Sequence, residues 1–272
     1  MKIKKFILNI IVIIQLLIFI FISPSYSSEK KGIGIADLDA TDKVKVLNVS
    51  WYYTWKPYPI KGINDIEFIP MIWGGKRIVS EKEYIRNTYG KVRYLLFLNE
   101  PDRTDQANLS VEDAIELFSE VKDLADEISS PACAGGINKW CNDFLEIARK
   151  KGLKVSFLAI HLYTSPDAKK FLETIDKIYK KYKLPIWITE FAVADWDAKK
   201  FGIKNRYSED EVLKFMQEVL PELEKRDFVR RYAWFGAGKD CYKKEQIRPS
   251  CLFDKDGKLT KVGLYYVNFN HN

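Results

Sequence analysis

The chain has 272 residues, with 44 Lys and Arg against 37 Asp and Glu, and a formal net charge of +7. Three of those lysines lie within residues 1–27, which hold no acidic residue, so the remainder carries +4. Its charges alternate in sign along predicted helices such as 111–128 and 165–183, which is typical of solvated helix faces. Basic runs interleaved with aromatic residues are absent from the sequence, which argues against nucleic-acid binding.

Residues 1–27 are typical of a secretory signal peptide. A lysine-rich start precedes the apolar run Phe6–Ile22, and the short polar stretch Ser23–Ser28 follows it. The run has 17 residues, at the lower limit of about 17–25 for a membrane-spanning helix, so a retained anchor is the alternative. Pro24 and the serines around it favour cleavage near Ser27. We therefore expect a secreted protein without stable membrane insertion.

The remaining residues, 28–272, suit one (β/α)8 barrel, whose typical length is about 250 residues. Short apolar runs predict eight strands, and several are almost uninterrupted, as strands buried on both faces require. The predicted strands are Gly32–Ala36, Val44–Ser50, Glu67–Trp73, Val92–Asn99, Ser130–Gly135, Ser156–Tyr163, Pro185–Glu190 and Arg231–Phe235.

Helical patterns alternate with these strands. Ser80 to Glu83 forms a capping box that predicts a helix as far as Tyr89, and Ser110 and Ser208 are predicted N-caps of later helices. Further helices are predicted at Asn138–Lys151, Pro166–Lys183, Glu209–Arg226 and Lys261–Asn268. This alternation favours a single-domain closed parallel barrel. An open doubly wound sheet is the runner-up, but the sequence has no GxGxxG or phosphate-loop motif.

Four cysteines, Cys133, Cys141, Cys241 and Cys251, indicate an oxidising compartment. Four cysteines allow three pairings, and we favour the two short loops Cys133–Cys141 and Cys241–Cys251, with the other pairings left open. The sequence has only two histidines and no Cys-x-x-Cys motif, so we expect no metal site and no cofactor.

Two glutamates lie at the carboxyl ends of predicted strands. Glu100 comes after the fourth strand and Glu190 ends the seventh, and neither has the surroundings of a helix-surface acid. In a barrel both would project into the mouth at the carboxyl ends of the strands, where catalytic groups lie. Glycoside hydrolysis needs such a pair, one protonated to release the leaving oxygen and one ionised to attack the sugar. The sequence therefore predicts a carboxylate pair for glycoside hydrolysis.

Aromatic residues make up 14% of the chain, and several follow predicted strands. Flat aromatic faces stack on sugar rings. Any single Trp is equally compatible with a position in the core. His161 is also compatible with a core position in which its ring is hydrogen-bonded. The strand-end motifs are Trp51–Trp55, Pro70–Gly74, Asn99–Asp102, His161–Tyr163, Thr189–Phe191 and Tyr232–Phe235, and the chain closes with Ser250–Asp254 and Gly257–Thr260. In this order and spacing they resemble glycoside hydrolase family 128, the glycosyl hydrolase catalytic core of endo-β-1,3-glucanases, over about residues 32–267.

The resemblance implies a role for each matching residue. Glu100 would be the acid/base, and Asn99 beside it would hydrogen-bond the 2-hydroxyl of the sugar being cleaved. Glu190 would be the nucleophile, with His161 and Tyr163 holding its orientation. Aromatic sugar contacts are implied at Trp234, under the reacting sugar, and at Trp51, Trp55 and Trp73 along the cleft.

Two departures from the family pattern bear on the substrate. Thr54 stands where the family often has Asn, and the insertion Asp195–Tyr207, with Trp196 and Phe201, is expected to reshape the cleft. We predict a monomeric, retaining endo-β-1,3-glucanase acting on β-glucan. The alternatives are a hydrolase of another β-glycan, such as β-1,4-glucan or mannan, and a barrel that binds glucan without cleaving it, although the latter usually lacks one carboxylate.

Overall fold

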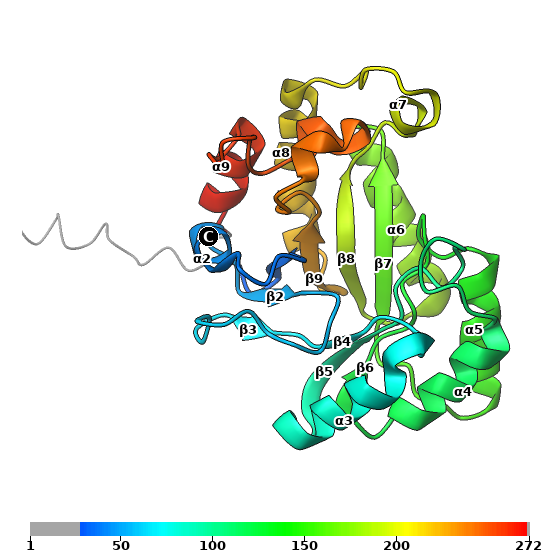
Figure 1. The fold of residues 1–272 in the computed structure, drawn as a ribbon. Coiled ribbons are helices and arrows are strands. Elements are labelled where there is room, and N and C mark those ends of the chain that lie inside the picture. The colour runs from blue at the N-terminus through cyan, green and yellow to red at the C-terminus, as the bar shows by residue number, and fades with distance from the viewer. Residues whose placement is uncertain (1–27, 271–272) are drawn as a thin grey trace, which may run out of the picture.

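The computed structural model describes residues 28–270, and strands alternate with helices along this part of the chain (Figure 1). The predicted signal peptide lies outside the described residues. All pairings between named strands are parallel, as the alternation predicts. The strands are β1 (Lys31–Gly34), β2 (Trp51–Tyr53), β3 (Glu67–Phe68), β4 (Met71–Ile72), β5 (Val92–Phe97), β6 (Ala125–Ile128), β7 (Leu158–Thr164), β8 (Ile186–Val193) and β9 (Val229–Trp234).

The strands form two parallel sheets, with orders β3-β2-β1-β9-β8-β7 and β4-β5-β6. β3 and β4 are two pieces of one predicted strand, interrupted at Pro70, which has no amide hydrogen to donate. Backbone hydrogen bonds continue across the break, from Ile69 N to Tyr52 O (2.9 Å) and from Leu96 N to Pro70 O (3.0 Å). On the other side, an isolated parallel bridge joins Ser129 to Phe157. The protein therefore has an α/β fold with parallel sheets.

Most helices begin where the sequence predicts. Ser110 and Asn138 accept backbone N–H bonds as N-caps, and Ser208 forms a full capping box with Glu211. The capping box predicted at Ser80 is wrong, because the 3-10 turn Gly75–Arg77 leads directly into α3 and leaves Ser80 inside it. The α-helices are α2 (Thr41–Val46), α3 (Ile78–Tyr89), α4 (Val111–Val121), α5 (Lys139–Lys150), α6 (Ala168–Tyr182), α7 (Trp196–Phe201), α8 (Glu209–Glu224) and α9 (Lys261–Asn268), and two further 3-10 segments are η2 (Cys241–Lys243) and η3 (Glu245–Ser250).

The position predicted for the second strand, Val44–Ser50, is wrong. Thr41–Val46 is helical, and the strand comes later, at Trp51–Tyr53. Alternating lysines and valines mimic a strand there, but the buried residues are Ala40, Val44 and Leu47, which have helical spacing, whereas Val46 is 48% exposed.

The fifth predicted strand is also misplaced. Ser130–Gly135 is largely irregular, and β6 precedes it. Asp126 and Glu127 in β6 broke the apolar pattern that the prediction required. They are tolerated there because Asp126 pairs with Lys91 (2.7 Å) and Glu127 with Arg230 (2.9 Å) near the surface.

Two lysines tie the start of the first strand to the ends of α9 and α8. Lys31 is fully buried, and its ammonium donates to the carbonyls of Tyr266 (2.9 Å) and Phe269 (2.7 Å) at the end of α9. Burial lowers the pKa of Lys31 to about 8. Lys30 likewise donates to Glu224 O (2.7 Å) at the end of α8. These contacts fix β1 at the centre of the larger sheet.

Both favoured disulfides are present. Cys133 is bonded to Cys141 and Cys241 to Cys251, and the described residues hold no free cysteine. Within residues 28–270, no helix has the length and apolar character needed to cross a bilayer.

Candidate active site

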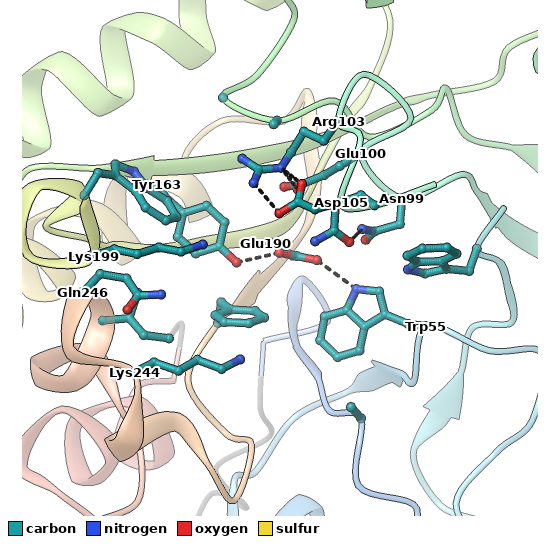
Figure 2. Close-up of a pocket in the computed structure, with 18 residues that line it drawn as sticks. Trp55, Asn99, Glu100, Arg103, Asp105, Tyr163, Glu190, Lys199, Lys244 and Gln246 are labelled. Atoms are coloured by element: carbon teal, nitrogen blue, oxygen red, sulfur yellow. Dashed lines mark hydrogen bonds and ion pairs between the residues drawn. The ribbon is translucent and has the colours of Figure 1, made fainter. Parts of the chain in front are cut away.

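A cavity of about 670 Å³ opens at the carboxyl ends of the strands (Figure 2). Such a volume lies within the range of small-molecule binding sites, about 300–1,000 Å³. Glu190 lies near the middle of the view, between Tyr163 and Trp55. The residues that line the cavity are Ala36, Trp55, Trp73, Asn99, Glu100, Arg103, Asp105, Gln106, Ala134, Gly135, Tyr163, Glu190, Trp196, Lys199, Phe235, Lys244, Gln246 and Ile247.

Glu190, in β8, is the most densely hydrogen-bonded group of the site. Its carboxylate accepts bonds from Trp55 Nε1 (2.8 Å) and Tyr163 Oη (2.5 Å), with Tyr53 Oη at 3.5 Å. Burial and the charge of Glu190 raise the pKa of Tyr163 well above its usual value, so its hydroxyl remains a donor. Donors on both oxygens fix the orientation of Glu190 and stabilise its negative charge.

His161, in β7, lies between the two glutamates. Its Nδ1 is 3.2 Å from Glu100 Oε1, and its Nε2 is 3.3 Å from Glu190 Oε1. The register between β7 and β8 shifts after Ile160, so that His161 pairs with Glu190 instead of Thr189. A bulge of this kind re-aims side chains next to active sites. It places the imidazole beside the carboxylate.

The pKa of His161 reflects two opposing effects. Burial disfavours the protonated ring, but the nearby charges of Glu190 and Glu100, together with the Glu100 contact, outweigh it and raise the pKa. A neutral imidazole can donate a hydrogen bond to only one of the two carboxylates, whereas a protonated one can donate to both.

Glu100 lies three residues after the end of β5, in an unusual backbone conformation. Its φ is 41°, a region that side-chain-bearing residues rarely occupy, and its amide donates to Ala132 O (2.8 Å). Arg103 Nε is 3.4 Å from Glu100 Oε2, and Asp105 binds the same guanidinium at 2.9 and 2.8 Å. The charge of Arg103 next to Glu100 is thus largely balanced by Asp105. Backbone strain of this type concentrates at functional sites.

Asn99 is buried beside Glu100. Its Nδ2 donates to Gln106 Oε1 (3.1 Å), while its Oδ1 has no hydrogen-bond partner among the described residues. A buried acceptor without a partner is costly, so a ligand hydroxyl that bonds it would gain affinity. Both Asn99 and Gln106 line the cavity.

Of the four tryptophans expected to contact sugar, two line the cavity and two are buried in the core. Trp55 and Trp73 line the cavity. Trp51 and Trp234 do not: both are completely buried, and Trp234 donates its indole N–H to Ser250 O (2.8 Å). The expectation that Trp234 forms the platform under the sugar is corrected, because its ring packs into the core beside Phe191 (5.0 Å between ring centroids). An exposed aromatic face is available instead at Trp196, in the insertion that the sequence singled out.

Several lining residues were missed from the sequence. Arg103 lies three residues after Glu100, a spacing that indicates a local ion pair and was a usable clue. Lys199, in α7, and Lys244 and Gln246, next to and in η3, come from segments that follow β8 and β9, and no strand-end pattern identifies them. Asp102, to which no chemistry was assigned, accepts bonds from the loop that carries the Cys133–Cys141 disulfide.

Glu100, His161 and Glu190 each offer one ligand atom, and these atoms lie within 4.8 Å of one another. These three residues are the ones that could hold a cation among residues 28–270. The two ring nitrogens of His161 point to different carboxylates, however, so the imidazole already links the pair.

Comparison with known proteins identifies the family of this chain. Residues 32–266 match the family described as glycosyl hydrolase catalytic core. One similar structure is an endo-β-1,3-glucanase of family GH128, subgroup I, from Amycolatopsis mediterranei, solved in complex with laminaritriose. It is 28% identical to this chain with a TM-score of 0.75, and the match covers 88% of this chain and 99% of that one. Other structures of that enzyme carry alanine in place of one of two glutamates and hold laminari-oligosaccharides. The subgroup II enzyme from Sorangium cellulosum is 26% identical with a TM-score of 0.71, over 88% and 98% of the two chains.

A curated relative extends well beyond the matched region. Alkali-sensitive linkage protein 1 of Schizosaccharomyces pombe is 26% identical over 245 residues, which are 85% of this chain and 42% of that protein. The chain thus spans less than half the length of this relative.

The fold, the carboxylate pair and the matches together define a glycoside hydrolase. The chain belongs to the glycosyl hydrolase catalytic core family, and the resemblance to glycoside hydrolase family 128 is confirmed.

Proposed function

We propose that this protein is a retaining endo-β-1,3-glucanase, with Glu100 as acid/base and Glu190 as nucleophile. The observation that carries the proposal is the closeness of the two carboxylates, whose nearest ligand atoms lie within 4.8 Å across the cavity. Retaining enzymes hold their carboxyl groups about 5–5.5 Å apart, whereas inverting enzymes need about 6.5–9.5 Å to admit a water molecule. The spacing therefore favours retention.

In the first step, Glu190 attacks the anomeric carbon, while Glu100 protonates the oxygen of the departing sugar. The bond from carbon to that oxygen breaks, and a glycosyl ester forms on Glu190. In the second step, Glu100 removes a proton from water, which attacks the same carbon, and Glu190 leaves as a carboxylate. The bonds from Trp55 and Tyr163 stabilise the charge that returns to Glu190 in this step.

Asn99 is proposed to bind the 2-hydroxyl of the attacked sugar. Asn99 lines the cavity beside Glu100, and its buried Oδ1 is an acceptor without a partner among the described residues. Trp55 and Trp73 also line the cavity and offer aromatic surface to a sugar. The positioning of Glu190 by His161 and Tyr163 is supported by their contacts of 3.3 and 2.5 Å.

We further propose that residues 28–272 form one closed (β/α)8 barrel. The backbone bonds that cross the β3/β4 break and the Ser129–Phe157 bridge favour closure, because they connect the two sheets on both sides. Catalytic groups at the carboxyl ends of the strands are the common arrangement in such barrels.

The β-1,3 linkage is inferred from the relatives, since the structural neighbours include endo-β-1,3-glucanases solved with laminari-oligosaccharides. Secretion is proposed from the two disulfides, which persist in oxidising compartments. A monomeric state remains a prediction, which sedimentation of the purified protein would test.

The test of this function is the release of reducing sugar from laminarin by the purified protein. Glu190→Ala should abolish turnover while preserving the fold. Glu100→Ala should retain more activity on aryl glycosides with good leaving groups, because these need less acid assistance. Wild-type rates in both variants would refute the assignment. Cleavage of β-1,4-glucan or mannan instead of laminarin would favour the alternative substrates, and glucan binding without hydrolysis would favour a binding barrel.

A further inference from the structure

The insertion Asp195–Tyr207 contributes one wall of the cavity. Within its short helix α7, Trp196 and Lys199 line the cavity, whereas Lys200 and Phe201 do not. Residues three apart on a helix lie on the same face, so the spacing accounts for this division. Figure 1 shows α7 at the end of the molecule where β7 and β8 end.

Trp196 lies close to the nucleophile. Its ring meets that of Tyr163 edge to face at 5.7 Å between centroids, and Tyr163 donates to Glu190. Despite this contact, Trp196 is 46% exposed. Lys199 Nζ lies 6.0 Å from the centre of the Trp196 ring, and no ion pair of Lys199 is found among the described residues. Figure 2 places Lys199 and Gln246 on the Tyr163 side of Glu190, across from Trp55.

The base of the insertion is firmly anchored. Asp195 is buried and accepts from Arg206 N (2.9 Å) and Nη2 (2.6 Å), and the bond from Arg206 holds the pKa of Asp195 well below its usual range. Asn205 Nδ2 donates to Glu245 O (2.9 Å) and Gln246 O (3.1 Å), and Asp195 N donates to Gln246 O (2.8 Å). Anchors at both ends hold the wall in place before substrate arrives, which reduces the ordering cost of binding.

We infer that α7 forms a glucosyl-binding subsite adjoining the reacting sugar, in which Trp196 stacks on a glucosyl ring and Lys199 hydrogen-bonds its hydroxyls. This subsite rests on the proposed function. It lies on the Tyr163 side of Glu190, across from Trp55, so a bound glucan would contact aromatic rings on both sides of the scissile bond. A protein that cleaves within a chain requires binding on both sides.

The test compares Trp196→Ala with Phe201→Ala on laminarihexaose. Both residues are exposed aromatics of α7, but Phe201, 61% exposed, does not line the cavity, which makes it a matched control. We expect Trp196→Ala to raise KM about tenfold, equivalent to about 1.4 kcal/mol, with kcat nearly unchanged. A loss of uniform binding raises KM alone. Phe201→Ala should leave both constants within twofold of wild type.

A second measurement removes catalysis from the comparison. In a Glu190→Gln background, which cannot turn over, calorimetry with laminarihexaose should show the same tenfold weakening for Trp196→Ala and a smaller one for Lys199→Met. Thermal unfolding of each variant identifies misfolding. Equal affinity with and without Trp196, or equal losses for Trp196→Ala and Phe201→Ala, would overturn the subsite. If wild-type protein cleaves laminarin in that event, the proposed function stands; if wild type neither cleaves nor binds β-1,3-glucan, both inferences fail.

Discussion

The hydrogen bond from Tyr163 to Glu190 provides the sharpest test of the mechanism. Tyr163→Phe removes only the hydroxyl that lies 2.5 Å from Glu190 Oε2, while the ring keeps its contacts with Trp196 and Phe235. A hydrogen bond to a charged group is worth about 1.5–3 kcal/mol, so kcat is expected to fall about 10- to 150-fold.

The loss should fall mainly on the second step. Glu190 regains its negative charge as the glycosyl ester breaks, and the Tyr163 hydroxyl stabilises that charge as it develops. With an aryl laminarioside, Tyr163→Phe should therefore show a rapid burst of aryl alcohol followed by slow turnover. Rapid-quench kinetics would measure the two phases separately.

Tyr53→Phe is the matched control. Its hydroxyl is also buried near Glu190, but at 3.5 Å, and its shorter bond goes to Thr189 O (3.0 Å). We expect a loss of stability of about 0.5–1.5 kcal/mol and a smaller effect on kcat. Unchanged kinetics in Tyr163→Phe, or equal losses in the two variants, would refute the assigned role of this hydrogen bond.

Three further predictions concern stability, pH and substrate. Replacing Cys241 and Cys251 by Ser should lower the free energy of unfolding by about 2.7 kcal/mol, because the disulfide restricts the unfolded chain over a sequence separation of 10. A urea titration that shows no loss of stability would contradict this prediction. Because the pKa of His161 is raised above 6.5, its protonated form should stabilise the fold fully below pH 6.5, and this contribution should vanish as pH rises through the folded-state pKa. His161→Gln should remove that dependence from unfolding curves at pH 5.5 and 8.5, and its persistence would point to another group. Asn99→Ala should lower kcat/KM about tenfold, as the loss of one hydrogen bond predicts. On a substrate that lacks the 2-hydroxyl, the same variant should lose little more. If the losses in kcat/KM from the variant and from the 2-deoxy substrate add up, the contact between Asn99 and the 2-hydroxyl is excluded.

Local sequence patterns were sufficient for much of the fold. Continuous apolar runs identified β5, β7 and β8, and N-caps such as Ser110 and Ser208 located helix starts. These features depend on residues only a few positions apart, so the local sequence is enough to predict them. The pattern was misleading around Val44, where a helix and a strand fit the same short alternation of polar and apolar residues.

The sequence also identified Glu100 and Glu190 as a pair, because strand ends in a parallel barrel converge. It did not determine which aromatic rings remain accessible. Trp234 and Trp196 both lie near strand ends, but one ring points into the core and the other borders the cavity. That difference depends on side-chain direction and on packing between segments far apart in the chain.

Only the tertiary structure brings His161 between the two carboxylates and places Arg103 with Asp105 beside Glu100. The position of His161 follows from a one-residue register shift between β7 and β8, which no local pattern specifies. The sequence by itself therefore determined that the fold is α/β with parallel strands, and it identified the two glutamates that the structure brings together. Distances, burial and the α7 wall were decided by long-range packing, since they depend on how distant segments meet in space.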